Sequence, residues 1–188
     1  MLTNTHKLLS KMLLNTVEGT RNFSKAQKLA FRWGNIRPDM HTPITKGKHM
    51  FDHSFDEVFS FWNYAEKQFD FDGVKCSYYL GIVLHFVADY FTLVHNDDAS
   101  MNDLKSHFAY ERKLHDIISH SVIVKTNDDF NGDFKKYIED LHKEYLAGEH
   151  SIERDCEYIL RSTYAITQWA TASVNAYNFI PREVVKMN

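Results

Sequence analysis

The sequence has few of the residues that interrupt regular structure, with 7 glycines and 3 prolines among 188 residues. A β-sandwich or β-barrel needs many tight turns, so this scarcity excludes most all-β architectures and favours long helices. Cysteine is also scarce. Cys76 and Cys156 are far apart in the chain, so we expect neither a disulfide framework nor a thiolate metal site.

The sequence also lacks a long uninterrupted apolar run. Its most apolar stretch, residues 78–94, has His85 and Asp89 near its middle, which predicts a buried core helix and no transmembrane segment. The opening residues include Lys7 and Lys11, so no signal peptide is predicted and a cytoplasmic location is expected. The formal net charge of -3 argues against binding to duplex nucleic acid. Nothing in the sequence indicates an oligomeric state.

The remaining composition is that of an ordinary globular domain, with 44% hydrophobic and 25% charged residues. Hydrophobic periodicity and capping residues predict helices. They cover residues 3–17, 24–33, 52–69, 74–94, 101–119, 133–146 and 151–179. Residues 34–48 contain two prolines and two glycines and are predicted to form a loop. We therefore expect one all-α domain over residues 1–188, a bundle of about seven helices.

Histidine is abundant, with 11 residues, and some of these lie at helical spacing from carboxylates. His85 and Asp89 are four residues apart and share one helix face, as are His107 and Glu111. A single such pair is commonly a neutral histidine bonded to a carboxylate in the core. Two pairs, with His95 between them, favour a zinc site, because imidazole nitrogen and carboxylate oxygen are zinc ligands that neighbouring helices can bring together.

Three further candidates lie upstream. Asp39 is in the predicted loop and His53 is near the start of the following helix, where polar residues beside a rigid scaffold are often functional. Taken singly, Asp39 is better explained as a turn residue or cap, and His53 as a surface polar residue. His6, in the first predicted helix, is ambiguous in the same way.

Taken together, these residues form a longer pattern. In chain order it is His6, then Asp39-x13-His53, then His85-x3-Asp89-x5-His95-x11-His107-x3-Glu111. The pattern resembles that of the zinc-dependent phospholipase C family and its relatives among the zinc-dependent single-strand nucleases. The resemblance covers more than half of the chain and implies an all-helical domain with a metal cleft.

The resemblance implies two or three bound zinc ions. One ion would be held by Asp39, His53, His85 and Asp89. A second would be held by His95, His107 and Glu111. His6 and Asp89 would contribute to a third, so that Asp89 bridges two ions. In the family, the amine and carbonyl of an N-terminal tryptophan complete the third site, whereas this sequence begins Met1-Leu2.

The implied activity is hydrolysis of a phosphodiester by zinc-activated water, with a phospholipid as one candidate substrate. Asp39 would be the catalytic residue that orients or deprotonates the water. Choline-specific members have aromatic residues where this chain has Met40 and Met50, so little preference for phosphocholine is expected. A nuclease or phosphomonoesterase on the same site, or a non-catalytic metal-binding domain, are the alternatives.

Overall fold

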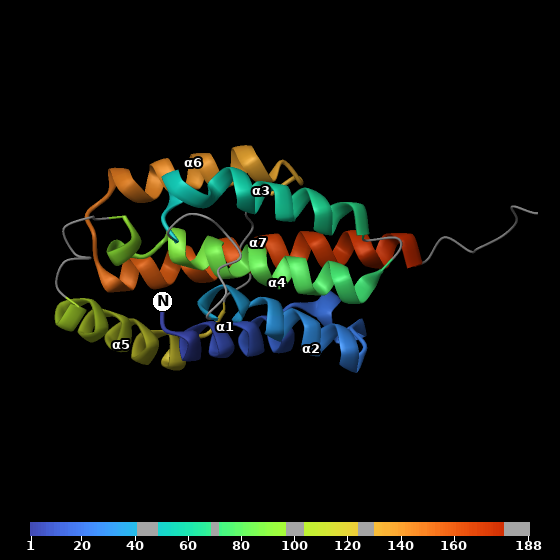
Figure 1. Cartoon of the computed structure of the whole chain (residues 1–188), viewed down its shortest axis with the longest axis horizontal. Coiled ribbons are helices and arrows are strands. Elements are labelled where there is room, and N and C mark those ends of the chain that lie inside the picture. The colour runs from blue at the N-terminus through green and yellow to red at the C-terminus, as the bar shows by residue number, and fades with distance from the viewer. Residues whose placement is uncertain (41–48, 69–71, 97–103, 124–129, 179–188) are drawn as a thin grey trace, which may run out of the picture.

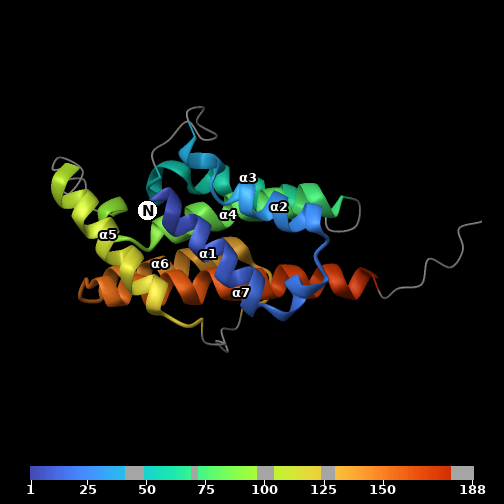
Figure 2. The same ribbon diagram turned by 90° about the horizontal axis from the view of Figure 1, so that it is seen from below.

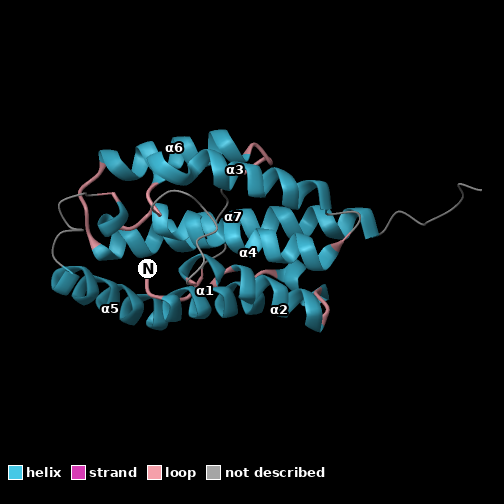
Figure 3. Ribbon diagram, viewed as in Figure 1, coloured by secondary structure: helices cyan, strands magenta, loops and turns pink. Residues whose placement is uncertain are grey.

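The computed structural model describes residues 1–40, 49–68, 72–96, 104–123 and 130–178, and these contain helices and no strand. The α-helices of the described residues are α1 (Thr3–Thr16), α2 (Lys25–Gly34), α3 (Phe51–Gln68), α4 (Gly73–Tyr90), α5 (Leu104–His120), α6 (Phe134–Ala147) and α7 (Ile152–Asn178). Three 3-10 helices accompany them: η1 (Glu18–Asn22), η2 (Arg37–Asp39) and η3 (Leu93–His95). The predicted all-α architecture is confirmed (Figure 3).

Several helices begin where a side chain satisfies the free backbone N–H groups of the first turn. Ser24 and Gln27 form a reciprocal capping box at the start of α2. Asp72 accepts hydrogen bonds from the backbone N–H groups of Val74 and Lys75 at the start of α4, and Asp133 caps α6 in the same way. These caps explain why sequence signals located the helix starts well.

Helix α4 forms the centre of the bundle. It packs against α2, α3 and α7, and every residue from Leu80 to Thr92 is buried. Figure 1 shows α3 and α6 along one side of α4 and α1, α2 and α5 along the other. In the turned view, α2, α3 and α4 form one layer and α6 and α7 a second (Figure 2). A helix enclosed on all sides needs an apolar sequence throughout, so the polar residues His85 and Asp89 require a specific explanation.

Helices α2 and α4 cross at a pair of glycines. A methyl group at Gly81 would lie 2.3 Å from the carbonyl oxygen of Phe31, and one at Gly34 would lie 2.0 Å from the carbonyl oxygen of Tyr78. Only residues without a Cβ allow the two backbones to approach this closely. The crossing lies one helical turn before His85.

The central helix ends earlier than the sequence predicts, at Tyr90 instead of residue 94. The Asn96 side-chain amide donates to the carbonyl oxygens of Tyr90 and Thr92, 2.8 Å away in each case. These bonds satisfy carbonyl groups that would otherwise continue the helix, and η3 follows. His95 therefore lies on the separate turn η3, and its side chain has a different orientation from the one it would have on a continued α4.

Among the described residues, no helix combines the length and the apolar character that crossing a bilayer requires.

Candidate metal centre

Residues from six segments converge beside the C-terminal end of α4, close to the chain's first residue. Figure 1 marks the amino terminus near this end of α4. Helix α1 contributes His6, η2 contributes Asp39, and the residues just before α3 contribute His49. Helix α4 contributes His85 and Asp89, η3 contributes His95, and α5 contributes His107 and Glu111. We refer to these residues together as the cluster.

Asp89 lies at the centre of the cluster and is fully buried. Its Oδ1 atom is 3.3 Å from Nε2 of His6, and its Oδ2 atom is 2.9 Å from Nδ1 of His49 and 3.3 Å from Nε2 of His85. Burial alone would raise the pKa of Asp89, but the Met1 ammonium group and the surrounding imidazoles lower that pKa well below its usual value. The carboxylate is therefore ionised and surrounded by nitrogen atoms.

His85 is oriented by a backbone group. Its Nδ1 atom donates to the carbonyl oxygen of Asn35, 3.0 Å away, at the glycine crossing of α2 and α4. This bond leaves Nε2 as the nitrogen that carries the lone pair, and it lies 3.3 Å from Nδ1 of His49 and 3.6 Å from Oδ1 of Asp39. A second hydrogen bond that fixes the ring and its tautomer is typical of histidines that bind metal.

His6 has an environment that suits a metal ligand. Its ring is fully buried and stacks on the ring of His85, with centroids 3.8 Å apart. Nε2 lies 3.3 Å from Oδ1 of Asp89 without good hydrogen-bond geometry, and Nδ1 has no hydrogen-bond partner among the described residues. Burial, together with His85, lowers the pKa of His6 to about 4, so the ring is neutral. A buried, unpaired imidazole nitrogen is costly, and a metal ion would satisfy it.

Two sets of ligand atoms are close enough to share an ion. One set comprises His6, His85 and Asp89, and the other comprises Asp39, His49 and His85; within each set the atoms lie within 4.8 Å of one another. Nitrogen and carboxylate oxygen donors in this combination suit zinc. The residues present therefore fit the metal that the family resemblance implies.

The remaining cluster residues form a neighbouring group. Nε2 of His107 lies 3.2 Å from Oε1 of Glu111, and the rings of His95 and His107 are 6.1 Å apart. Glu111 is 4% exposed, although it is on a helix with a polar outer face. Burial lowers the pKa of His95 well below its usual value, so its ring is neutral as a metal ligand requires.

The amino group of Met1 joins the two parts of the cluster. It donates to Oδ1 of Asp89 at 2.6 Å and lies 3.2 Å from Oε1 of Glu111 and 3.1 Å from Nε2 of His95. Burial alone would lower the pKa of this amine, but Asp89 and Glu111 raise it. No side-chain pattern could have identified Met1; the only signal was the N-terminal amine that the family resemblance implies at the third site.

One candidate ligand, His53, lies outside both ligand sets of the cluster. This side chain is exposed on α3 and lines a surface pocket with Asp52 and Asp56. The buried face of α3 contains Ser54 and Val58, so His53, one residue before Ser54, is rotated by about 100° toward solvent. His49, which precedes the helix, reaches the cluster instead. The pattern of spacings missed it because loop residues follow no period.

The two histidines give a direct test of this placement. We expect His49→Gln to lower zinc affinity by at least ~10-fold, the lower range of losses seen when a metal site is disturbed. His53→Gln should bind zinc as tightly as the unmodified chain, because its side chain faces solvent. The measurement is competition with a chromogenic chelator. A larger loss in His53→Gln than in His49→Gln would contradict the described geometry.

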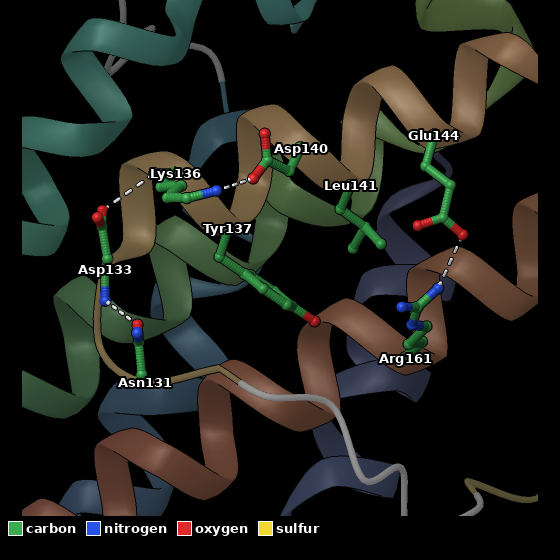
Figure 4. A pocket seen from close by; sticks show the side chains of 8 residues that line it. All are labelled: Asn131, Asp133, Lys136, Tyr137, Asp140, Leu141, Glu144 and Arg161. Atoms are coloured by element: carbon green, nitrogen blue, oxygen red, sulfur yellow. Dashed lines mark hydrogen bonds and ion pairs between the residues drawn. The ribbon is translucent and has the colours of Figure 1, made fainter.

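A separate pocket between α6 and α7 does not include any cluster residue (Figure 4). Its charged side chains pair with one another: Lys136 with Asp140 on α6, and Arg161 with Glu144 at 3.3 Å. Surface ion pairs of this kind contribute little to stability. This pocket does not combine imidazole and carboxylate groups as the cluster does.

We compared the chain with known sequences and solved structures. No curated protein sequence matches the chain. Among solved structures, the alpha toxin of Clostridium absonum superposes with a TM-score of 0.64 over 94% of this chain and 64% of the toxin, at 13% identity. The Clostridium perfringens alpha-toxin from an avian strain gives a TM-score of 0.58 over 93% of this chain and 62% of the toxin, at 17% identity.

The chain thus spans less than two thirds of the length of either toxin, and at these identities the likeness shows a shared fold. Sequence comparison supplies the family. Residues 5–152 match the family described as zinc dependent phospholipase C, and this range includes every cluster residue that contributes a side chain. The chain belongs to the zinc dependent phospholipase C family.

Proposed function

We propose that this protein is a zinc-dependent hydrolase of phosphodiester bonds, most similar to a phospholipase C. The observation that carries the proposal is the convergence of two ligand sets, His6–His85–Asp89 and Asp39–His49–His85, around a buried carboxylate. Membership of a zinc-dependent family supports the choice of metal. A buried cluster of this kind is expensive to maintain without a bound cation.

The cluster has enough ligands for two or three ions. Asp39, His49, His85 and Asp89 would hold one, and His95, His107 and Glu111 a second. His6 and Asp89 would contribute to a third. Bound zinc supplies Lewis acidity, which makes water nucleophilic near neutral pH and stabilises negative charge on the phosphoryl group.

Asp39 is the carboxylate best placed to act on water. Its side chain is 16% exposed, whereas that of Asp89 is fully buried. The Thr3 hydroxyl donates to Oδ2 of Asp39 at 2.8 Å and holds the carboxylate in position. One oxygen of Asp39 is thereby fixed, and the group can orient a water molecule and accept its proton.

The substrate side of the proposal is a phosphodiester, with a phospholipid as the leading candidate. Met40 is 41% exposed next to Asp39, and Met50 adjoins His49. Thioether side chains lack the negative ring face that attracts a quaternary ammonium group. We therefore propose hydrolysis without a strong preference for a phosphocholine ester.

The first test is zinc content and turnover. Zinc-loaded protein is expected to retain at least two ions after dialysis and to hydrolyse bis(p-nitrophenyl) phosphate. Because metal binds the folded chain, chelation should also lower the melting temperature. Asp39→Asn should lower the rate by at least ~10²-fold, the scale of a lost general base. Asp56→Asn, an exposed carboxylate on α3, is the matched control and should keep full activity.

The alternatives give different results in the same assays. Faster turnover of a phosphomonoester or of single-stranded DNA would move the proposal to a phosphomonoesterase or a nuclease. Zinc binding without turnover of any of these substrates would identify a non-catalytic metal-binding domain. Protein that folds without zinc and is not stabilised by it would refute the proposal.

A further inference from the structure

A buried carboxylate outside the cluster connects the segments that carry its second group of ligands. Asp155, on α7, is fully buried and lies beyond the residues that match the family. Its Oδ1 atom accepts a hydrogen bond from the Tyr145 hydroxyl at 2.7 Å. Its Oδ2 atom accepts one from the backbone N–H of Leu93 at 3.1 Å and one from the Tyr110 hydroxyl.

The bond to Leu93 holds the turn that carries His95. Leu93 is the first residue of η3, and the N–H at the start of a 3-10 helix has no partner within that helix. Asp155 supplies this partner from α7. The position of His95, two residues later, therefore depends on a side chain that lies far from it in the sequence.

The hydrogen bond between Asp155 and Tyr110 holds α5, the helix that carries His107 and Glu111. Tyr110 lies on α5, between His107 and Glu111 and directly before the latter. Its hydroxyl is also 3.2 Å from the Leu93 N–H. One carboxylate oxygen of Asp155 therefore binds both η3 and α5. These two hydrogen bonds help to fix the distance of His95 from His107 and Glu111.

The far end of the His95 turn has an independent support. The Asn96 side chain is bonded to the carbonyl oxygens of Tyr90 and Thr92, and its Oδ1 atom accepts a hydrogen bond from Nε2 of His142 at 2.8 Å. Loss of the Asp155 bonds should therefore shift the Leu93 end of the turn without releasing the turn completely. This predicts altered metal affinity in a protein that still folds.

We propose that Asp155 is a positioning residue, which holds His95, His107 and Glu111 at the separation needed to bind one zinc ion. This inference rests on the proposed function. Its chemistry suits the role, because a buried carboxylate that accepts several hydrogen bonds is rigid, whereas an apolar side chain would fill the space without orienting anything. Outer residues of this kind influence metal affinity strongly in other sites.

The test compares variants that differ in which bonds they lose. Asp155→Asn keeps the size of the side chain but replaces one acceptor oxygen with a donor. It is expected to weaken the binding of one zinc ion by ~10–100-fold, the range for lost outer partners. Zinc held by the other ligands, Asp39, His49, His85, Asp89 and His6, should be retained. Tyr145→Phe is the matched control, because it removes a bond to Asp155 that does not involve η3 or α5.

Zinc affinity is measured by chelator competition, and the ligand geometry by the absorption spectrum of cobalt-substituted protein. Both the affinity and the spectrum should change in Asp155→Asn and stay unchanged in Tyr145→Phe, even if both variants melt at lower temperature. Should Asp155→Asn fail to fold, Tyr110→Phe removes the link between α5 and η3 and should show the same change to a smaller extent.

Equal melting losses with unchanged zinc affinity and cobalt spectrum in all three variants would overturn the proposal and leave Asp155 a purely structural residue. None of these measurements requires turnover. If the wild-type chain binds zinc but hydrolyses nothing, the proposed enzymatic function is wrong. The role of Asp155 is then still decided by the zinc affinities and cobalt spectra of the variants. A wild-type chain that binds no zinc would overturn both at the first measurement.

Discussion

Asp89→Asn is expected to lose bound zinc and activity more completely than any other single change in the cluster. Asp89 is the common neighbour of His6, His49 and His85, at 3.3, 2.9 and 3.3 Å. Asp89 belongs to two of the proposed zinc sites, and the substitution removes its negative charge from both. The loss in zinc affinity should therefore exceed the ~10–100-fold effect of outer residues.

The matched comparison is Glu111→Gln, which affects only the group containing His95 and His107. Elemental analysis after dialysis should show fewer ions per chain in Asp89→Asn than in Glu111→Gln. Equal zinc contents in the two variants would contradict the central position of Asp89.

The same variant should also be weakened without metal. In chelated protein the Met1 ammonium group is buried between Asp89 and Glu111, and removal of one partner of a buried ion pair typically costs about 3–5 kcal/mol. Urea unfolding of both chelated proteins measures this difference. A metal-free Asp89→Asn that is as stable as the metal-free wild type would show that the amine does not depend on this carboxylate.

Gly81→Ala is expected to reduce both stability and metal binding. The added methyl group would lie 2.3 Å from the carbonyl oxygen of Phe31 and 2.9 Å from the backbone nitrogen of Asn35. These are backbone atoms, so α2 and α4 must separate, and overpacking of this kind costs about 1–3 kcal/mol and occasionally more. Separation would also stretch the bond from His85 Nδ1 to the Asn35 carbonyl, which orients the ring.

Gly73→Ala supplies the control on the same helix. A methyl group there would approach only the end of the flexible Gln27 side chain, at 2.6 Å, and alanine is the better helix former by about 1 kcal/mol. Urea unfolding should therefore show a large loss for Gly81→Ala and little or none for Gly73→Ala. Similar small effects in both would mean that the helices can separate easily at the crossing.

The helices were largely predictable because their signals are local. Apolar residues at helical spacing and capping residues such as Ser24 and Asp133 act within a few positions of the helix they define. The early end of α4 was missed because it depends on Asn96, whose side chain folds back on Tyr90 and Thr92. Sequence periodicity alone continues the helix through these residues.

The cluster was predictable where its residues sit on helices and less so elsewhere. His85 with Asp89, and His107 with Glu111, are four residues apart, so helix geometry alone places each pair on one face. His49 has no such constraint, since it precedes α3, and His53 was expected in its place. The Asn35 carbonyl and the Met1 amine are backbone groups, which no pattern of side chains reveals.

The separation of the cluster residues along the chain also has a consequence for the order of assembly. The contact between Met1 and Asp89 spans 88 residues, and closing so long a loop is slow compared with forming a helix. During synthesis the amino end emerges first, yet its partners on α4 and α5 follow much later. The contacts of Met1 and His6 with these partners therefore cannot form until the chain has been synthesised through Glu111. The set of zinc ligands is complete only after that point.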